Sequence, residues 1–126
     1  MAVEFPIFYV DPSDPQSTVY AVESFEEAER GGIEEFDVMD ENFAIWDSTG
    51  ERVRAAVRRE GAHWLHLEPT GVEDMRGLRE AIRAYAAAVG VSTKDLATLP
   101  PADALTKLEE AAERRRSPRR WYEFWR

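Results

Sequence analysis

Two histidines, His63 and His66, are the first residues of this chain to consider for metal or acid–base chemistry. Their spacing of three would place them on opposite faces of a β-strand, so the two imidazoles could not share a metal ion. The chain contains no cysteine and no HExxH motif, which are common sources of zinc ligands. The sequence therefore predicts no metal site and no cofactor. We expect His63 to pack at a hairpin edge and His66 to bond to a neighbouring group.

Motifs for nucleophilic catalysis and for phosphate binding are also missing. No serine lies in a Gly-x-Ser-x-Gly pattern, and Gly31-Gly32 lacks the lysine that follows a phosphate-binding loop. Residues 37–42 gather oxygen ligands but lack the central glycine and final glutamate of a calcium loop. We therefore predict that the chain is not an enzyme. An enzyme that uses paired carboxylates in a pocket is kept as the third of three hypotheses.

The carboxylates are concentrated in the first part of the chain. Residues 1–51 hold fourteen acidic residues and one arginine, a net charge of −13, whereas residues 52–126 carry +4, which gives −9 for the whole chain. An acidic surface repels nucleic acids and accelerates encounters with cationic partners. The alternative is that these charges only keep the protein soluble.

The first functional hypothesis is a small acidic protein that binds a basic protein partner. Immunity proteins and antitoxins against nuclease toxins work on this physical logic, because their carboxylates imitate the phosphates that the toxin would bind. We expect two tryptophans on one face of the sheet, beside Arg54 and Arg58, where they are either covered by helices or exposed as a binding hot spot. The predicted partner-binding residues are Glu34, Glu35, Asp37, Asp40, Glu41, Asp47, Glu51, Trp46 and Trp64.

The C-terminal sequence SPRRWYEFWR, residues 117–126, combines aromatic rings with arginines. Stacking planes beside positive charge suit single-stranded nucleic acid, but a pI near 4.7 argues against that ligand. We predict that the tail docks on its own domain, since burying each large ring contributes about 2–3 kcal/mol. The second functional hypothesis is a structural or regulatory module that forms a homodimer through this tail. The docking residues are Trp121, Tyr122, Phe124 and Trp125.

The N-terminal half reads mainly as strands with one short helix. Residues 5–10 and 18–22 are rich in β-forming residues, and Pro6 indicates an edge strand or a strand that starts after it. A capping box at residues 24–27 begins a short helix that Gly31-Gly32 ends. Residues 36–47 are expected to contain strand structure, firmest at 43–46, followed by a turn at residues 47–50.

Residues 53–58 and 62–68 are predicted to form a hairpin with a three-residue loop at 59–61. This register pairs Ala55 with Leu65 on an apolar face, and Arg52 with Glu68 on the opposite face. A slip of one residue would mix the two faces.

The C-terminal half reads as helices. A second capping box at residues 70–73 precedes an apolar stripe that ends at Gly90, and residues 102–116 form a further helix with Leu105, Leu108 and Ala112 inward. Ser117-Pro118 is expected to open a last element. The chain is therefore predicted to be a single α+β domain over residues 1–126: an antiparallel β-meander to residue 69, with helices of residues 70–116 packed on one face of it, then the tail. We expect a cytoplasmic protein, because no signal peptide or apolar spanning segment is present.

Overall fold

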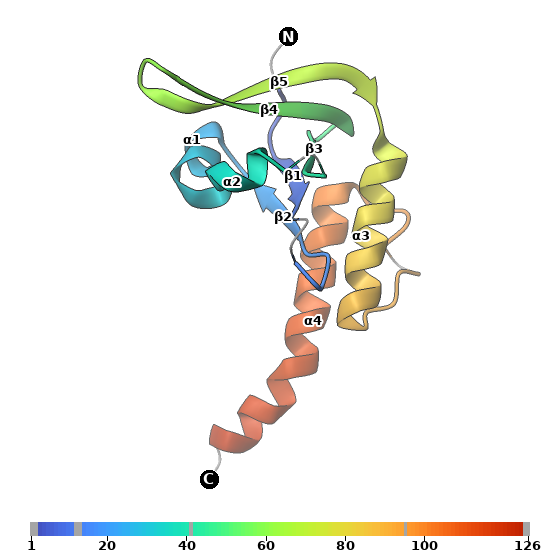
Figure 1. Ribbon diagram of the computed structural model, residues 1–126. Helices are drawn as coiled ribbons and strands as arrows, with labels where there is room; N and C mark the ends of the chain where they lie inside the picture. The colour runs from blue at the N-terminus through green and yellow to red at the C-terminus, as the bar shows by residue number, and fades with distance from the viewer. Residues whose placement is uncertain (1–2, 12–13, 41, 95, 125–126) are drawn as a thin grey trace.

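The structure is a computed structural model that describes residues 3–11, 14–40, 42–94 and 96–124; the side chains of residues 60 and 115–124 lie outside this description. The strands are β1 (Ile7–Val10), β2 (Val19–Val22), β3 (Ala44–Trp46), β4 (Glu51–Glu60) and β5 (His63–Glu73). The helical elements are α1 (Phe25–Glu27), the π-helical turn η1 (Ala28–Gly32), α2 (Glu35–Val38), α3 (Met75–Val89) and α4 (Pro101–Phe124) (Figure 1).

The strands form one antiparallel sheet in the order β2-β1-β3-β4-β5. This confirms the predicted α+β class, with two long helices following the sheet. The order is that of a meander only from β3 to β5, because β2 lies at the edge and β3 pairs with β1. β1 begins after Pro6, as expected, and lies inside the sheet. The segment from α1 to α2 connects β2 to β3 across one face.

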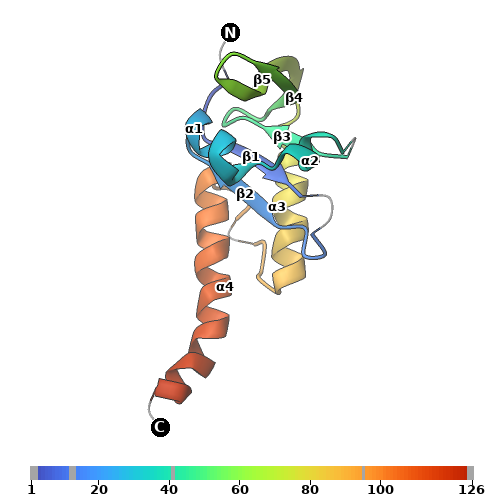
Figure 2. The ribbon, with the colours of Figure 1, turned by 60° about the vertical axis from the view of Figure 1, so that its left-hand side comes forward.

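Helical elements cover both faces of the sheet, whereas the sequence suggested one (Figure 2). On one face, Phe8 and Trp46 pack with α3 and α4 through Leu78, Ile82 and Leu108. The opposite face packs with the α1–α2 segment in a second cluster, which contains Ile7, Tyr9, Val22, Ala28, Ile33, Ile45, Val53 and Leu65. Successive residues of a strand therefore belong alternately to the two apolar clusters, because neighbouring side chains of a strand point to opposite faces.

The predicted apolar stripe of α3 is confirmed, and the helix ends at Gly90, whose φ of 76° is the left-handed value that favours glycine at this position. The start of the helix differs from the expectation. Residues 70–73 belong to β5, and Asp74 is the N-cap, with its Oδ1 accepting a hydrogen bond from the Gly77 N–H (3.2 Å). Pairing with β4 therefore extends the strand through the predicted capping box.

The inward residues of α4 are those predicted: Leu105, Leu108 and Ala112 are all buried. The helix continues through Ser117-Pro118, so these two residues do not open a separate element. No helix in the described part of the chain combines the length and the apolar composition needed to cross a lipid bilayer.

The β4–β5 hairpin forms with a register that differs by two residues from the prediction. Ala55 lies opposite Leu67 and Arg54 opposite Glu68, and the tip pairs Glu60 with His63. The turn is therefore tighter than the expected three-residue loop, and an irregularity lies between Val57 and Glu60. The ion pair on the outer face is formed by Arg54 and Glu68 (2.7 Å) instead of Arg52 and Glu68.

Two predicted local motifs are confirmed: the capping box of the first helix and the turn after β3. At α1, the Glu27 N–H donates to Ser24 Oγ (3.2 Å), while the Glu27 carboxylate accepts from the backbone N–H of Glu23 (3.0 Å). After β3, Asp47 Oδ1 accepts hydrogen bonds from the N–H and hydroxyl of Thr49 (2.9 and 2.6 Å). These bonds satisfy backbone donors that the adjacent elements leave unpaired.

The expectation of strand structure from residue 36 is wrong for its first part. Residues 35–38 form the helical turn α2, and strand pairing begins only at Ala44. Ile33 is 1% exposed and still has extended backbone, and within the following helical turn Asp37 is the buried residue, 6% exposed. The helical turn α2 therefore determines which side chains of residues 34–40 are exposed to solvent.

Candidate functional site

The acidic segment presents a compact surface around α2. We call it the acidic α2 surface and define it by Asp11, Glu34, Phe36, Met39 and Asp40; the carboxyl group of Asp37 is buried next to these residues. Phe36 is 65% exposed and Met39 is 78% exposed, which makes them the two most exposed large apolar side chains in the described part of the chain. Glu34 and Asp40 are exposed beside them.

The local sequence explains why two large apolar side chains point outward. Ile33, whose backbone is extended, packs into the cluster that also contains Ile45 and Leu65, and in the helical turn of residues 35–38 Asp37 is the buried side chain. Phe36 and Met39, three residues apart, then share the opposite side of the turn. When a partner covers apolar side chains of this size, their burial makes the free energy of binding more favourable.

The carboxylates of this surface lie close enough to the buried Asp37 to influence its pKa. Burial raises the pKa of Asp37, and the negative charges of Asp11, Glu34 and Asp40 raise it further. The phenol of Tyr9 experiences the same field: burial, Tyr20 and the carboxylates of Asp37, Asp11 and Glu34 raise the pKa of Tyr9 to about 12. Burial is the larger cause for both groups, and the neighbouring carboxylates add to it in the same direction.

The remaining predicted carboxylates have different surroundings. Glu35 forms an ion pair with Arg59 of β4 (2.6 Å), so its charge is already balanced within the chain. Glu51 begins β4, opposite Glu73 of β5. Glu41 lies outside the described residues. These three do not add a negative charge that the structure places on the acidic α2 surface.

Asp47 and Trp46 are used inside the domain. Asp47 is 2% exposed and holds the turn after β3 through its hydrogen bonds to Thr49 and the N–H of Glu51. Trp46 is 5% exposed in the cluster under α3 and α4, and its indole N–H donates to Asp74 Oδ2 (3.1 Å). Neither side chain is therefore part of the acidic α2 surface.

Trp64 does not share a face with Trp46, contrary to the expectation. It packs against the opposite cluster, and its indole N–H donates to the Glu29 carbonyl of η1 (3.3 Å). The Glu29 carboxylate accepts from the backbone N–H of Trp64 (3.1 Å) and contacts Nδ1 of His63 (2.7 Å). The two tryptophans thus anchor helical segments on the two faces, and they do not form one exposed patch.

The histidines have the structural surroundings that the sequence suggested. His63 lies at the hairpin tip against Glu29 and Phe25, and His66 Nε2 lies 3.0 Å from the Arg58 carbonyl oxygen. Among the residues that the structure describes, no three side chains of the histidine, aspartate and glutamate types are grouped so that they could hold a metal ion.

The aromatic tail stays a prediction. The side chains of Trp121, Tyr122 and Phe124 lie outside the description, as does Trp125 altogether. The backbone of α4 continues to Phe124 and extends beyond the sheet and α3 (Figures 1 and 2).

Sequence reasoning missed Phe36, Met39 and Asp11 as members of the surface. Residues 36–47 were expected to contain strand structure, so Phe36 and Met39 were not predicted as an exposed pair, and Asp11 was interpreted only as a turn residue. A helical turn of four residues is too short for its apolar spacing to reveal it in the sequence. No family model, curated protein or solved structure matches this chain.

Replacing Asp37 with asparagine is expected to raise the free energy of unfolding at pH 7 by about 0.5–1 kcal/mol, because each like-charge neighbour costs about 0.2–0.5 kcal/mol. A raised folded-state pKa means that the ionised carboxylate opposes folding, and this opposition is lost as the pH falls through that pKa. The advantage of Asp37→Asn should therefore shrink on acidification.

Urea unfolding of the wild type and the variant between neutral pH and the ordinary aspartate pKa of 3.8 tests this expectation. Glu110→Gln, an equal change at an exposed position of α4, is the control and should show no comparable trend. A stability difference that is independent of pH would contradict the proposed repulsion.

Proposed function

We propose that this chain is a small cytoplasmic binding protein that docks on a basic protein partner through the acidic α2 surface, as an inhibitor of the immunity or antitoxin type. The observation that carries the proposal is the exposure of Phe36 (65%) and Met39 (78%) among carboxylates. Apolar anchors at the centre and charges around them are the arrangement found at protein–protein hot spots.

The two parts of the surface would perform different tasks in binding. Phe36 and Met39 lose contact with water when a partner covers them, and this burial would slow dissociation. Glu34 and Asp40 would attract lysine and arginine side chains over several ångströms and accelerate association. A fitting partner therefore has an apolar pocket with a basic rim.

The charge of the surface also favours a protein over a nucleic acid or an anionic membrane. Phosphate groups would be repelled by the same carboxylates that raise the pKa of Asp37. If the partner is itself an enzyme that binds phosphates through a basic groove, the acidic α2 surface would compete for that groove. Inhibition would follow from this competition.

A photo-crosslinking side chain placed at position 36 tests the proposal. The same group at position 72 is a matched control, because Val72 is also well exposed (56%) but lies on β5. In lysate of the source cells, position 36 is expected to capture a protein of net positive charge that position 72 does not capture. Equal capture at both positions would argue against a specific surface.

The captured protein is then purified, and its association rate with the full chain is measured against salt. We expect the rate to fall at least about tenfold between about 0.05 and 0.5 M salt, since screening shortens the reach of charges to a few ångströms. An acidic captured protein, or an association rate that does not change with salt, would overturn the proposal.

A further inference from the structure

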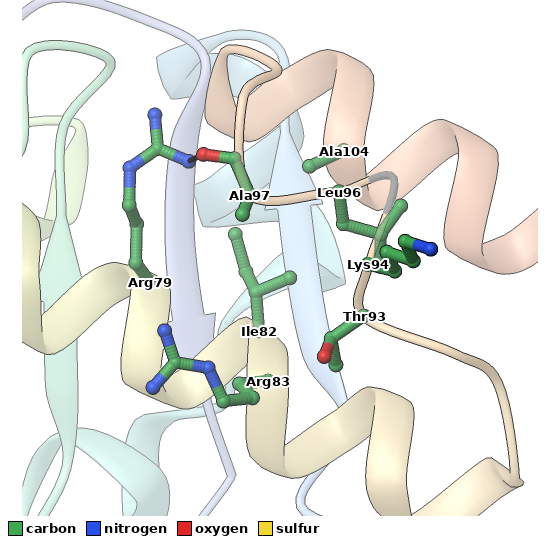
Figure 3. Close-up of a pocket in the computed structure, with 8 residues that line it drawn as sticks. All are labelled: Arg79, Ile82, Arg83, Thr93, Lys94, Leu96, Ala97 and Ala104. Carbon is green, nitrogen blue, oxygen red and sulfur yellow. Dashed lines mark hydrogen bonds between the residues drawn. The ribbon is translucent and has the colours of Figure 1, made fainter.

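A cavity of about 240 Å³ lies between α3, the connection of residues 91–94 and 96–99, and the start of α4 (Figure 3). It is formed by elements on the face of the sheet opposite the α1–α2 segment, so it is separate from the acidic α2 surface. With about 30 Å³ for each water molecule of liquid, the cavity offers the space of roughly eight waters. This size suits a small organic molecule.

The floor of the cavity is apolar and well packed. Ile82 of α3, Leu96 of the connection and Ala104 of α4 all line it, and each is at most 6% exposed because it also belongs to the cluster between the helices and the sheet. An apolar floor of this kind favours the hydrocarbon part of a ligand.

Positive side chains surround this floor on two sides. Arg79 and Arg83 approach from α3, and Lys94 and the Thr93 hydroxyl belong to the opposite wall (Figure 3). Arg79 Nη1 donates to the carbonyl oxygens of Ala97 (3.4 Å) and Leu99 (3.0 Å), which fixes the guanidinium at the cavity edge. A guanidinium has five N–H donors on three nitrogens, so its remaining donors can still serve an anion.

The charges of this wall are not balanced by carboxylates that the structure describes. Among those carboxylates, none forms an ion pair with Arg83 or Lys94, and Glu80 on the same helix pairs with Arg76 (3.4 Å). Arg79 and Arg83 are four residues apart on a helix, an arrangement in which their like charges repel each other. A bound anion would relieve this repulsion.

We propose that the cavity binds a small organic anion, in which an oxyanion headgroup, carboxylate or phosphate, is attached to a compact apolar body. The headgroup would accept hydrogen bonds from the arginines and the Thr93 hydroxyl, since the guanidinium fork matches the geometry of these oxyanions. The body would lie on Ile82 and Leu96. A nucleic acid does not fit the cavity, and the net charge of −9 on the chain would repel it.

The test uses the full chain and four probes: hexanoate, hexyl phosphate, the neutral hexanamide and inorganic phosphate. Chemical shifts of backbone amides are followed by NMR during each titration. We expect one or both of the amphiphilic anions to bind with a Kd of about 1 mM or lower and to shift the amides of α3 and the connection that line the cavity. Hexanamide and inorganic phosphate, which lack the charge or the body, should bind at least about tenfold more weakly.

Two variants locate the binding. Arg83→Gln removes an exposed cation of the wall and should weaken binding of the better anion about tenfold, as expected for a charged hydrogen bond. Lys107→Gln makes the same change of net charge at an exposed position of α4 outside the lining and should have little effect. Hexanamide binding as tightly as hexanoate and hexyl phosphate, equal effects of the two variants, or no shift of the lining amides by any probe would each overturn the proposal.

Discussion

Asp74→Ala is expected to lower the free energy of unfolding by about 2–3 kcal/mol, because a single carboxylate joins β3, β5 and α3. Its Oδ1 caps α3 through the N–H of Gly77 (3.2 Å), and such caps contribute about 1 kcal/mol. Its Oδ2 accepts the indole N–H of Trp46 (3.1 Å), which is 5% exposed and would lose its acceptor. A buried donor without a partner costs about 1–3 kcal/mol.

Urea unfolding followed by circular dichroism measures this loss. Asp74→Asn is an informative comparison, because its one remaining side-chain oxygen can accept from Gly77 or from Trp46 with good geometry but not from both. We expect it to lose about half as much stability as Asp74→Ala. Asp103→Ala, at an exposed acidic residue in the first turn of α4, is the control; it loses only an interaction with the helix dipole and should change stability by less than about 1 kcal/mol.

If Asp74→Ala and Asp103→Ala had equal effects, Asp74 would not be the junction that the hydrogen bonds indicate. The NMR signal of the Trp46 indole N–H provides a second readout, because it should shift when its acceptor is removed. A lost cap alone would leave this signal in place.

Asp74 also illustrates what sequence patterns could not decide. Thr70 and Asp74 are both acceptable N-cap residues, and the spacing of Thr70 and Glu73 favoured the first. In the folded chain the Thr70 hydroxyl donates to the Arg52 carbonyl of β4 (2.8 Å), so Thr70 stabilises the pairing of β4 with β5 and does not cap a helix. The choice between the two caps depends on how far β4 and β5 pair, which is a contact between distant parts of the chain.

The hairpin shows why the faces of a strand are easier to predict than its register. The prediction paired Ala55 with Leu65, and the structure pairs Ala55 with Leu67. Because side chains alternate with a period of two, a shift of two residues leaves Ala55 and Leu65 on the same face as before. Hydrophobic patterning therefore decided the face, while the turn geometry at the tip decided the register.

The acidic α2 surface could be predicted only in part for a different reason. The carboxylates are visible as composition, and Glu34, Asp37 and Asp40 do lie close together around α2. Phe36 was not recognised as an exposed side chain, because residues 36–47 were expected to contain strand structure. A helical turn of four residues is too short to be recognised by periodicity, and the packing of Ile33 on the sheet orients it.

Phe36→Ala is expected to weaken binding of the basic partner about 30-fold or more, which corresponds to about 2 kcal/mol, the scale of an aromatic hot spot. The loss should appear mainly in the dissociation rate, because short-range apolar contacts form after the encounter. Val72→Ala removes another exposed apolar side chain, on β5, and should leave the affinity unchanged.

Glu34→Lys should affect the other rate constant. Glu34 is exposed and its side chain makes no capping hydrogen bond to α2, so the change should leave the fold intact while it reverses one charge of the surface. The association rate with the basic partner should fall several-fold at low salt, and the difference from wild type should vanish at high salt. Surface plasmon resonance at several salt concentrations measures both rates.

Glu110→Lys on α4 makes the same charge change away from the surface, and it separates two explanations of such a result. If the partner responds to the field of the acidic α2 surface, Glu34→Lys slows association much more than Glu110→Lys. Equal slowing by both variants would mean that the partner senses only the net charge of −9, and the proposed docking site would then be wrong. The division between a dissociation effect at Phe36 and an association effect at Glu34 is therefore what distinguishes a specific interface from a merely acidic protein.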